Sequence, residues 1–371
     1  MVDSTSPHAY RDGLFTAGGS SALLEQIRSV DDACRQSRVE PVYTLMHLCV
    51  LARVSYKDAR NILLEPGSHY KTRSIVKRGR KNGRQKIRVL HEPSPTLKAL
   101  QQAIFRNCLP AGPSSPISYA FEAGRSTLEA AKLHVGAKSL VSVDVSDFFG
   151  SIRATGVFHL FSRLGYPELL SYEMALLTTV GQSSVPKHDD PGLTYRTKHV
   201  GALPQGASTS GKLANLLCSD LDLQLMRIRR RWGGVVTRYA DDICLTLPRR
   251  ITRAEGAAIH RELEQALRSC GFKLNRSKTR IVLNAATFNM LGLCVGQDKV
   301  WLRKSYKQMV RAHLHGIEKF GLSAHMKDRN YSSEPEVISS MWGHYAYSAG
   351  IEPKFAAEIA SRLKRSGILP I

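Results

Sequence analysis

The segment Arg238-Tyr239-Ala240-Asp241-Asp242-Ile243 places two adjacent carboxylates between runs of strand-forming residues. Residues 235–239 favour an extended chain, and residues 243–247 alternate in the manner of a half-buried strand. The sequence therefore predicts a β-hairpin with both acids at its tip. Two ionised carboxylates side by side repel each other unless a cation neutralises them. Asp is also common in ordinary turns, so the pair alone does not distinguish a site from a polar turn.

Composition and charge narrow the class of partner. The chain has 371 residues, of which 43% are hydrophobic, enough for a large core and more than one lobe. Its 53 Lys and Arg outnumber its 31 Asp and Glu, giving a net charge of +22. This excess indicates a polyanionic partner, with nucleic acid favoured and an anionic membrane surface as the alternative. No apolar run is long enough to span a membrane, and residues 1–7 lack a secretion signal, so we expect a cytoplasmic protein with no membrane partner.

The cysteines argue against a disulfide framework or a zinc site. There are seven, which is an odd number, and none is spaced as Cys-x-x-Cys. We therefore expect buried free thiols.

A basic segment runs from Lys71 to Arg88, with nine Lys or Arg residues and no acid. Asn82-Gly83 within it is a hairpin signal, so the segment predicts two short basic strands joined by a tight turn. It fits either a solvated face or a ribbon that clamps phosphates, since Arg can grip a triphosphate with two hydrogen bonds.

A second carboxylate site lies on a predicted strand at residues 140–145. Leu140, Ser142 and Asp144 share one face of this strand, and the three intervening valines share the other. Asp144 should therefore emerge at the end of the strand, next to Asp147-Phe148-Phe149.

The remaining segments predict helices around a sheet. Ser55 and Asp58 resemble a helix cap, and Glu65-Pro66-Gly67-Ser68 ends the first helical region. After Leu203-Pro204-Gln205-Gly206, the leucines of residues 213–225 predict one helix capped by residues 208–210. The alternation of strands and helices indicates an α+β layer. From residue 287 we expect a short hairpin and then a basic amphipathic helix, which fits either a phosphate backbone or an ordinary surface.

Asp144, Gln205-Gly206, Tyr239-Ala240-Asp241-Asp242 and Lys278 occur in that order, and this set resembles the palm of reverse transcriptases. The resemblance covers about residues 70–293 and continues more faintly to the C-terminus. It implies an α+β right-hand polymerase with fingers, palm and thumb. We accordingly expect a helical N-terminal extension at 1–66, fingers and palm at 67–286 and a basic helical thumb at 287–371.

The resemblance also assigns a metal centre. Nucleotidyl transfer uses two divalent ions about 4 Å apart, one activating the primer hydroxyl and one holding the triphosphate. Mg²⁺ is expected, with Mn²⁺ as the alternative, because hard ions prefer carboxylate oxygens. Asp144 and Asp241 would bridge both ions, Asp242 would be the more peripheral carboxylate, and Val145 completes the metal set. Lys278 matches a lysine that would act on the leaving pyrophosphate as a fourth catalytic residue.

Further roles are carried over from the family by position. Phe149 matches the aromatic gate that excludes a ribose 2′-hydroxyl. The alternative is that Phe149 is a core residue, since either Phe148 or Phe149 could be the buried ring of the pair. The expected nucleotide-binding residues are Arg88, Lys77 (with Lys81 as an alternative), Asp147, Phe148, Phe149, Gln205 and Gly206. The expected primer- and template-binding residues are Tyr239, Arg125, Arg303, Lys307 and Arg311.

Within the family, the chain looks most like the bacterial retron-type branch. Residues 119–126 and 147–152 follow its pattern, whereas Ala130-Ala131-Lys132-Leu133-His134 lacks the usual Asn and Met290-Leu291-Gly292 keeps only the Gly of Val-Thr-Gly. Ser210-Gly211 stands where Ser-Pro is usual. A related antiviral-defence reverse transcriptase or a group II intron-like enzyme is the close rival.

The retron resemblance implies a dedicated structured non-coding RNA as template and primer, an RNA–DNA hybrid product built from dNTPs, RNA-linked DNA (msDNA), and a role in phage defence with an effector protein. Two other classes stay open at this point. One is an RNA-directed RNA polymerase or a template-independent polymerase that shares the palm. The other is a catalytically idle RNA-binding scaffold.

Overall fold

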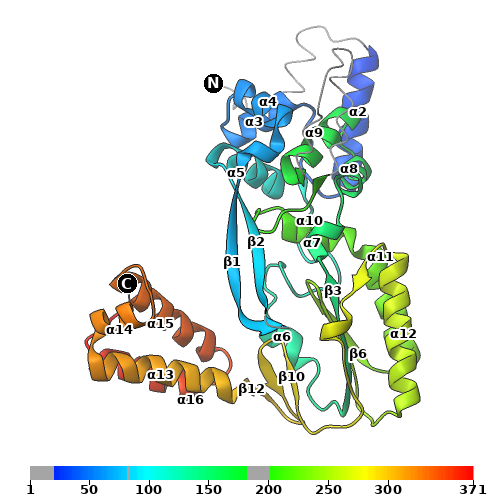
Figure 1. Ribbon diagram of the computed structural model, residues 1–371. Helices are drawn as coiled ribbons and strands as arrows, with labels where there is room; N and C mark the ends of the chain where they lie inside the picture. The colour runs from blue at the N-terminus through cyan, green and yellow to red at the C-terminus, as the bar shows by residue number, and fades with distance from the viewer. Residues whose placement is uncertain (1–20, 82–83, 182–200, 371) are drawn as a thin grey trace.

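The computed structural model describes residues 21–81, 84–181 and 201–370, and for residues 76–88 it describes the backbone alone. Figure 1 shows helices at the N-terminal end, a long β-hairpin, a sheet flanked by helices and a separate group of C-terminal helices. The mixture of helices and antiparallel strands confirms the α+β class.

The N-terminal helices pack onto helices from the middle of the chain. Ser55 caps one of them by accepting a hydrogen bond of 3.0 Å from the backbone N–H of Asp58, which confirms the predicted cap. The Tyr166 hydroxyl donates to the backbone carbonyl of Glu40 at 2.9 Å and ties the two groups together. The elements of this region are α2 (Ser21–Gln36), α3 (Leu45–Ala52), α4 (Tyr56–Leu64), η1 (Pro66–His69), α5 (Pro95–Ala103), η2 (Ile104–Cys108), α8 (Ala154–Arg163) and α9 (Glu168–Thr178).

The basic segment forms the predicted pair of strands. β1 (Tyr70–Lys81) pairs antiparallel with β2 (Arg84–Pro93), and the register shifts between Val76 and Arg80. The predicted turn at 82–83 lies outside the described residues, as do the side chains of Lys77, Lys81 and Arg88. The phosphate-binding role of these three residues therefore stays a prediction.

A five-stranded sheet forms the centre of the molecule. β3 (Ser139–Ser146) pairs antiparallel with β7 (Asp242–Leu247), and β7 pairs with β6 (Val235–Tyr239). On its other edge β3 pairs with β8 (Lys273–Leu274) and β9 (Arg280–Val282). The three valines of β3 lie in the larger apolar core and Leu140 lies in a second core, which confirms the predicted two faces of this strand.

Helices α11 and α12 run along one side of this sheet (Figure 1). The prediction of one continuous helix after Gly206 was wrong, because the structure has two helices that are separated at Cys218. The second helix has Asp220 and Asp222 in its first turn, and acids there stabilise a helix N-terminus. The elements around the sheet are α6 (Thr127–Lys132), α7 (Phe148–Ser151), β4 (Val180–Gly181), β5 (Gly201–Ala202), α10 (Ser210–Leu217), α11 (Ser219–Trp232), α12 (Arg253–Ser269) and η3 (Arg276–Lys278).

The C-terminal region has its own apolar core. Where the sequence indicated a short hairpin, the structure has a three-stranded antiparallel sheet of β10 (Phe288–Met290), β11 (Leu293–Val295) and β12 (Val300–Leu302). The predicted basic helix is α13 (Lys304–Phe320), followed by α14 (Leu322–Asp328), α15 (Glu334–Ala349) and α16 (Pro353–Arg365). This second core also includes Leu140 and Cys244 of the central sheet. The larger core runs from Cys34 to Leu274, so the boundaries near 66 and 287 remain predictions.

All seven cysteines lie in the described part of the chain and are free thiols, five of them buried, as expected. Among the residues that the structure describes, no helix has the length and apolarity needed to cross a bilayer.

Candidate active site

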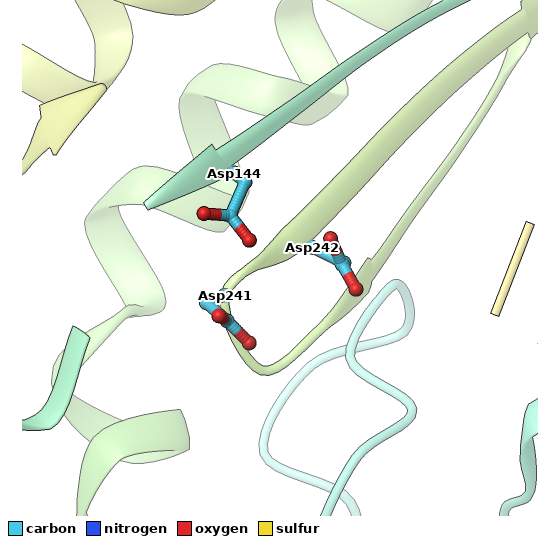
Figure 2. Close-up of side chains that lie close together, drawn as sticks. All are labelled: Asp144, Asp241 and Asp242. Atoms are coloured by element: carbon cyan, nitrogen blue, oxygen red, sulfur yellow. The ribbon is translucent and has the colours of Figure 1, made fainter. Parts of the chain in front are cut away.

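Three carboxylates converge at one end of the central sheet. Figure 2 shows Asp144 at the end of β3 facing Asp241 and Asp242 at the β6–β7 tip, and one oxygen of each lies within 4.8 Å of the others. Strand register explains the meeting, because Asp144 pairs with Asp242, and Asp242 pairs with Tyr239 across the turn. Ala240 adopts a positive φ of 54° in this two-residue turn, as tight hairpin turns require. The predicted tip is confirmed.

Asp144 is the fixed member of the cluster. It is 2% exposed, and its carboxylate accepts a hydrogen bond of 2.8 Å from the Asn275 side chain and one from the Lys278 ammonium. The backbone N–H of Asn275 also donates to the Asp144 carbonyl at 2.8 Å. Sequence reasoning missed Asn275, whose only signal is its place just after β8, the strand beside β3. Lys278 lies at the cluster, as predicted, while its role toward pyrophosphate stays a prediction.

The electrostatics of the cluster favour a bound cation. Burial and the neighbouring carboxylates raise the pKa of Asp242 to about 6, and burial together with Asp144 also raises the pKa of Asp241. Partial burial acts to lower the pKa of Lys278, but the hydrogen bond to Asp144 and the charges of the three carboxylates together outweigh it and raise the pKa. Three carboxylates that repel one another, with oxygens within ligand reach, fit a hard divalent ion. Val145 donates its N–H to the Asp241 carbonyl at 2.9 Å, while its own place in the metal set stays a prediction.

These shifts predict how the metal-free protein responds to pH. An acid with a raised pKa in the folded state costs no stability below its unfolded pKa of 3.8, and its full cost appears above about 6. The Asp242 side chain reaches the surface even though the surrounding chain partly desolvates its carboxyl. The stability of Asp242→Asn should therefore match that of the wild type at the acidic end and exceed it by about 1 kcal/mol above pH 6, after allowing for solvent screening. Unfolding in denaturant with EDTA, at several pH values, measures this difference.

Added Mg²⁺ should make the wild type more stable than Asp242→Asn above pH 6, because the wild type binds the ion more tightly and gains more stability from it. A difference that does not change with pH, or that persists unchanged with Mg²⁺, would contradict this picture.

The expected nucleotide-side residues lie around the same strand end. Phe148 is buried and stacks on Phe272 with centroids 5.8 Å apart, so Phe149 is the partly exposed ring of the pair. Asp147 is exposed and has a positive φ of 46°. Phe148 is therefore the buried ring because it packs on Phe272, which lies between α12 and β8. The sequence alone could not show this long-range contact.

Gln205 and Gly206 contact the basic hairpin. The Gln205 carbonyl accepts a hydrogen bond of 2.7 Å from the His91 backbone N–H of β2. Gly206 has a φ of 118°, and a Cβ there would lie 3.0 Å from the His91 carbonyl oxygen. A glycine is needed at this position because the chain passes close to β2, whatever further contact it makes with a nucleotide.

A cleft of about 450 Å³ opens beside Asp242 and reaches the C-terminal sheet. Arg303, an expected primer- or template-binding residue, lines it together with Lys278 and Arg280. Lys307 and Arg311 instead form ion pairs with Glu352 and Glu358. The structure thus brings Arg303 to the site, while the charges of the other two are partly neutralised within the C-terminal helices.

Tyr239 and Arg125, two of the residues expected to bind primer or template, both make contacts within the protein. Tyr239 ends β6 and is half-buried against the larger core. The Arg125 guanidinium donates to the backbone carbonyls of Ser115 and Ser118 and lies 4.9 Å from the centroid of the Tyr119 ring. Arg125 therefore braces its own loop, and its contact with nucleic acid stays a prediction.

The comparison with known proteins agrees with this geometry. The family described as reverse transcriptase (RNA-dependent DNA polymerase) matches residues 77–295, which include all three acids. The retron Ec86 reverse transcriptase of Escherichia coli is 33% identical over 281 residues, covering 75% of this chain and 79% of that protein. The chain belongs to the reverse transcriptase family, in its retron branch.

Other similarities are more partial. The retron Mx162 reverse transcriptase of Myxococcus xanthus is 31% identical over 268 residues, and the match covers 69% of this chain but only 54% of that protein. Among solved structures, telomerase from Candida albicans superposes with a TM-score of 0.40 and 10% identity, covering 80% of this chain and 60% of that one. The family match makes this reverse transcriptase an RNA-directed DNA polymerase with a palm built on β3, β6 and β7.

The palm of this reverse transcriptase rests on a buried polar network that sequence reasoning missed. Arg238, fully buried, donates two hydrogen bonds of 2.6 and 2.8 Å to the Asp222 carboxylate and one of 2.9 Å to Asn215. Asn215 in turn donates to Glu122 at 3.0 Å. The network fixes β6, immediately before the Asp241–Asp242 tip, to α10 and α11.

The incomplete element that ends in His134 has a structural role in this reverse transcriptase. The His134 ring is buried and contacts the hydroxyls of Thr237 at 2.8 Å and Thr246 at 2.7 Å. Burial lowers the pKa of His134 to about 4, so the ring is neutral at pH 7. It holds the end of α6 against the two strands of the catalytic hairpin.

Proposed function

We propose that this reverse transcriptase is of retron type and copies a dedicated structured non-coding RNA into DNA that stays linked to RNA. The RNA serves as both template and primer, the enzyme works in the cytoplasm, and its product acts in phage defence with an effector protein. The proposal is supported by the retron-like segments at 119–126 and 147–152 and by the retron relatives.

The observation that carries the catalytic part is the convergence of Asp144, Asp241 and Asp242. These three side chains would hold Mg²⁺, with Mn²⁺ as the alternative ion, and the bound metal would activate the primer hydroxyl and stabilise the triphosphate. Asn275 keeps the Asp144 carboxylate in place, and Lys278 supplies a cation beside it. We assign the deoxyribose gate to Phe149, whose ring is the accessible one of the pair.

RNA binding is proposed to rest on the basic surface of the chain. The net charge of +22 favours a polyanion, and Arg303 lines the cleft beside Asp242. Contacts to phosphates and 2′-hydroxyls suit a folded RNA that is recognised mainly by its shape. Lys307 and Arg311 would join this surface by releasing Glu352 and Glu358 and pairing with phosphates instead, which replaces one partly exposed ion pair with another.

The decisive test is to sequence the nucleic acid that copurifies with the protein from its host. We expect one RNA species of defined sequence, joined covalently to a complementary DNA, because a dedicated template and primer leaves a single product. One sample is treated with RNase and sequenced as DNA, and a second is treated with DNase and sequenced as RNA.

The matched control is an Asp241→Asn protein expressed in the same host, which should carry the RNA without the DNA. A mixture of unrelated RNAs on the wild type would contradict the retron proposal, while leaving RNA-directed DNA synthesis in place.

A further inference from the structure

Phe121 occupies an unusual position next to the proposed gate. Its side chain is 53% exposed although it is a large apolar residue, and its ring centroid lies 5.9 Å from that of Phe149 with an interplanar angle of 59°. Phe149 also contacts Phe148, at 5.3 Å between centroids. The gate ring therefore contacts one buried and one exposed aromatic ring.

The backbone at Phe121 is held in a conformation that a bulky residue rarely adopts. Its φ is 58°, in the left-handed region, where a Cβ is unfavourable. Strain of this kind persists only where the surroundings over-determine it, and it is concentrated at functional sites.

Both neighbours of Phe121 are fixed by buried polar contacts. Asn215 donates to the Ala120 carbonyl at 2.7 Å, and the Glu122 carboxylate accepts from Asn215 at 3.0 Å and from Lys212 at 3.1 Å. Glu122 also accepts from the backbone N–H of Ser114 at 2.9 Å. Because these groups belong to the network that includes Arg238, the Phe121 ring is held by the same scaffold as the catalytic tip.

Gly211 makes room for the ring. A Cβ built at this position would lie 2.4 Å from Cγ of Phe121 and 2.7 Å from its Cβ, so no other residue fits there without moving the ring. The place of Phe121 therefore requires a glycine at this position.

We propose that Phe121 is a positioning residue for sugar selection: it backs Phe149 from the exposed side and keeps that ring where it excludes a ribose 2′-hydroxyl. The inference rests on the proposed gate function of Phe149. Without the Phe121 ring, Phe149 has free space on one side and moves into it, and the space next to the sugar widens.

The test measures kcat/KM for dGTP and for GTP, using the full chain, Mg²⁺ and a poly(rC) template with an oligo(dG) primer. Phe121→Ala should lower the preference for dGTP about three- to tenfold, the range expected from one aromatic pair, with kcat for dGTP nearly unchanged. Phe121→Tyr keeps the ring and should retain the preference. Gly211→Ala, which favours the helix but displaces the ring, should lower it as Phe121→Ala does.

A double variant separates positioning from other roles. In a Phe149→Ala background the change at Phe121 should have no further effect on sugar preference, because the ring that it positions is gone. Phe105→Ala removes another exposed phenylalanine, 43% accessible, and is the control that should change nothing.

An unchanged preference in both Phe121→Ala and Gly211→Ala, with a lowered one in Phe149→Ala, overturns the positioning role and leaves the polymerase function intact. An equal rise in KM for dGTP and GTP points to a template contact and also overturns it. A wild type that makes no DNA either on poly(rC) or on its copurified RNA contradicts the function and the positioning role together.

Discussion

Asp241→Asn is expected to lower the rate of DNA synthesis by about 10³-fold or more while the protein still folds and binds RNA. The substitution keeps the size of the side chain and leaves the backbone bond from Val145 in place, but it removes one of three converging negative charges. Carboxylate oxygens are the ligands that hard divalent ions require, and their contribution to the transition state is worth several kcal/mol. A factor of 10³ corresponds to about 4 kcal/mol of that stabilisation.

Single-turnover primer extension with Mg²⁺ measures the rate, and a gel-shift titration with the copurified RNA measures binding. Asp298→Asn, which removes an exposed acid between β11 and β12, is the matched control and should leave both unchanged. DNA synthesis at the wild-type rate by Asp241→Asn would rule out the assigned site. Loss of RNA binding together with activity would indicate a folding defect instead.

The second large effect concerns stability. Asp222→Asn should lower the free energy of unfolding by about 3–5 kcal/mol, because it leaves the Arg238 guanidinium charged, fully buried and without its partner. Arg238→Met combined with Asp222→Leu should recover most of this loss, since replacing both charges with apolar groups removes the desolvation cost. Equilibrium unfolding in urea, followed by circular dichroism, measures both variants.

The chain offers a control with nearly the same geometry at the surface. Arg311 donates two hydrogen bonds of 2.8 Å to Glu358, and their side chains are 50% and 33% exposed. Glu358→Gln should cost less than about 1 kcal/mol because water can solvate both groups. Equal losses at the two sites would contradict the claim that burial, rather than pairing itself, sets the size of the effect.

Local patterns predicted well the strands and the hairpin that carry the three acids. The alternation of residues 140–145 predicted the two faces of β3, and the segment around Asp241 predicted a hairpin with acids at its tip. Both predictions succeeded because strand periodicity and turn preference depend on residues adjacent in the sequence. The partners that hold these elements were not predictable in this way. Asn275 is 131 positions from Asp144, and Asp222 is 16 from Arg238, so their contacts depend on tertiary packing.

The partners of the charged side chains on helix α13 also depend on tertiary packing, so the sequence could not predict them. Its charges fitted either a phosphate backbone or an ordinary surface, and in the structure Lys307 and Arg311 pair with acids that lie 45 and 47 positions later in the chain. The helix was predicted correctly because its apolar stripe is local, whereas the environment of its charged face depends on α16. Arg303, which precedes the helix, keeps its place beside the cleft.

The second apolar core has a consequence for cooperativity. It joins residues of β10–β12 and α13–α16 to Leu140 and Cys244, which belong to the two central strands that also carry Asp144 and Asp242. The two central strands thus share an apolar core with residues 288–368. Opening of this core would expose apolar side chains of the same two strands that carry Asp144 and Asp242, so we expect local opening there and loss of the geometry of the acids to belong to a single unfolding unit.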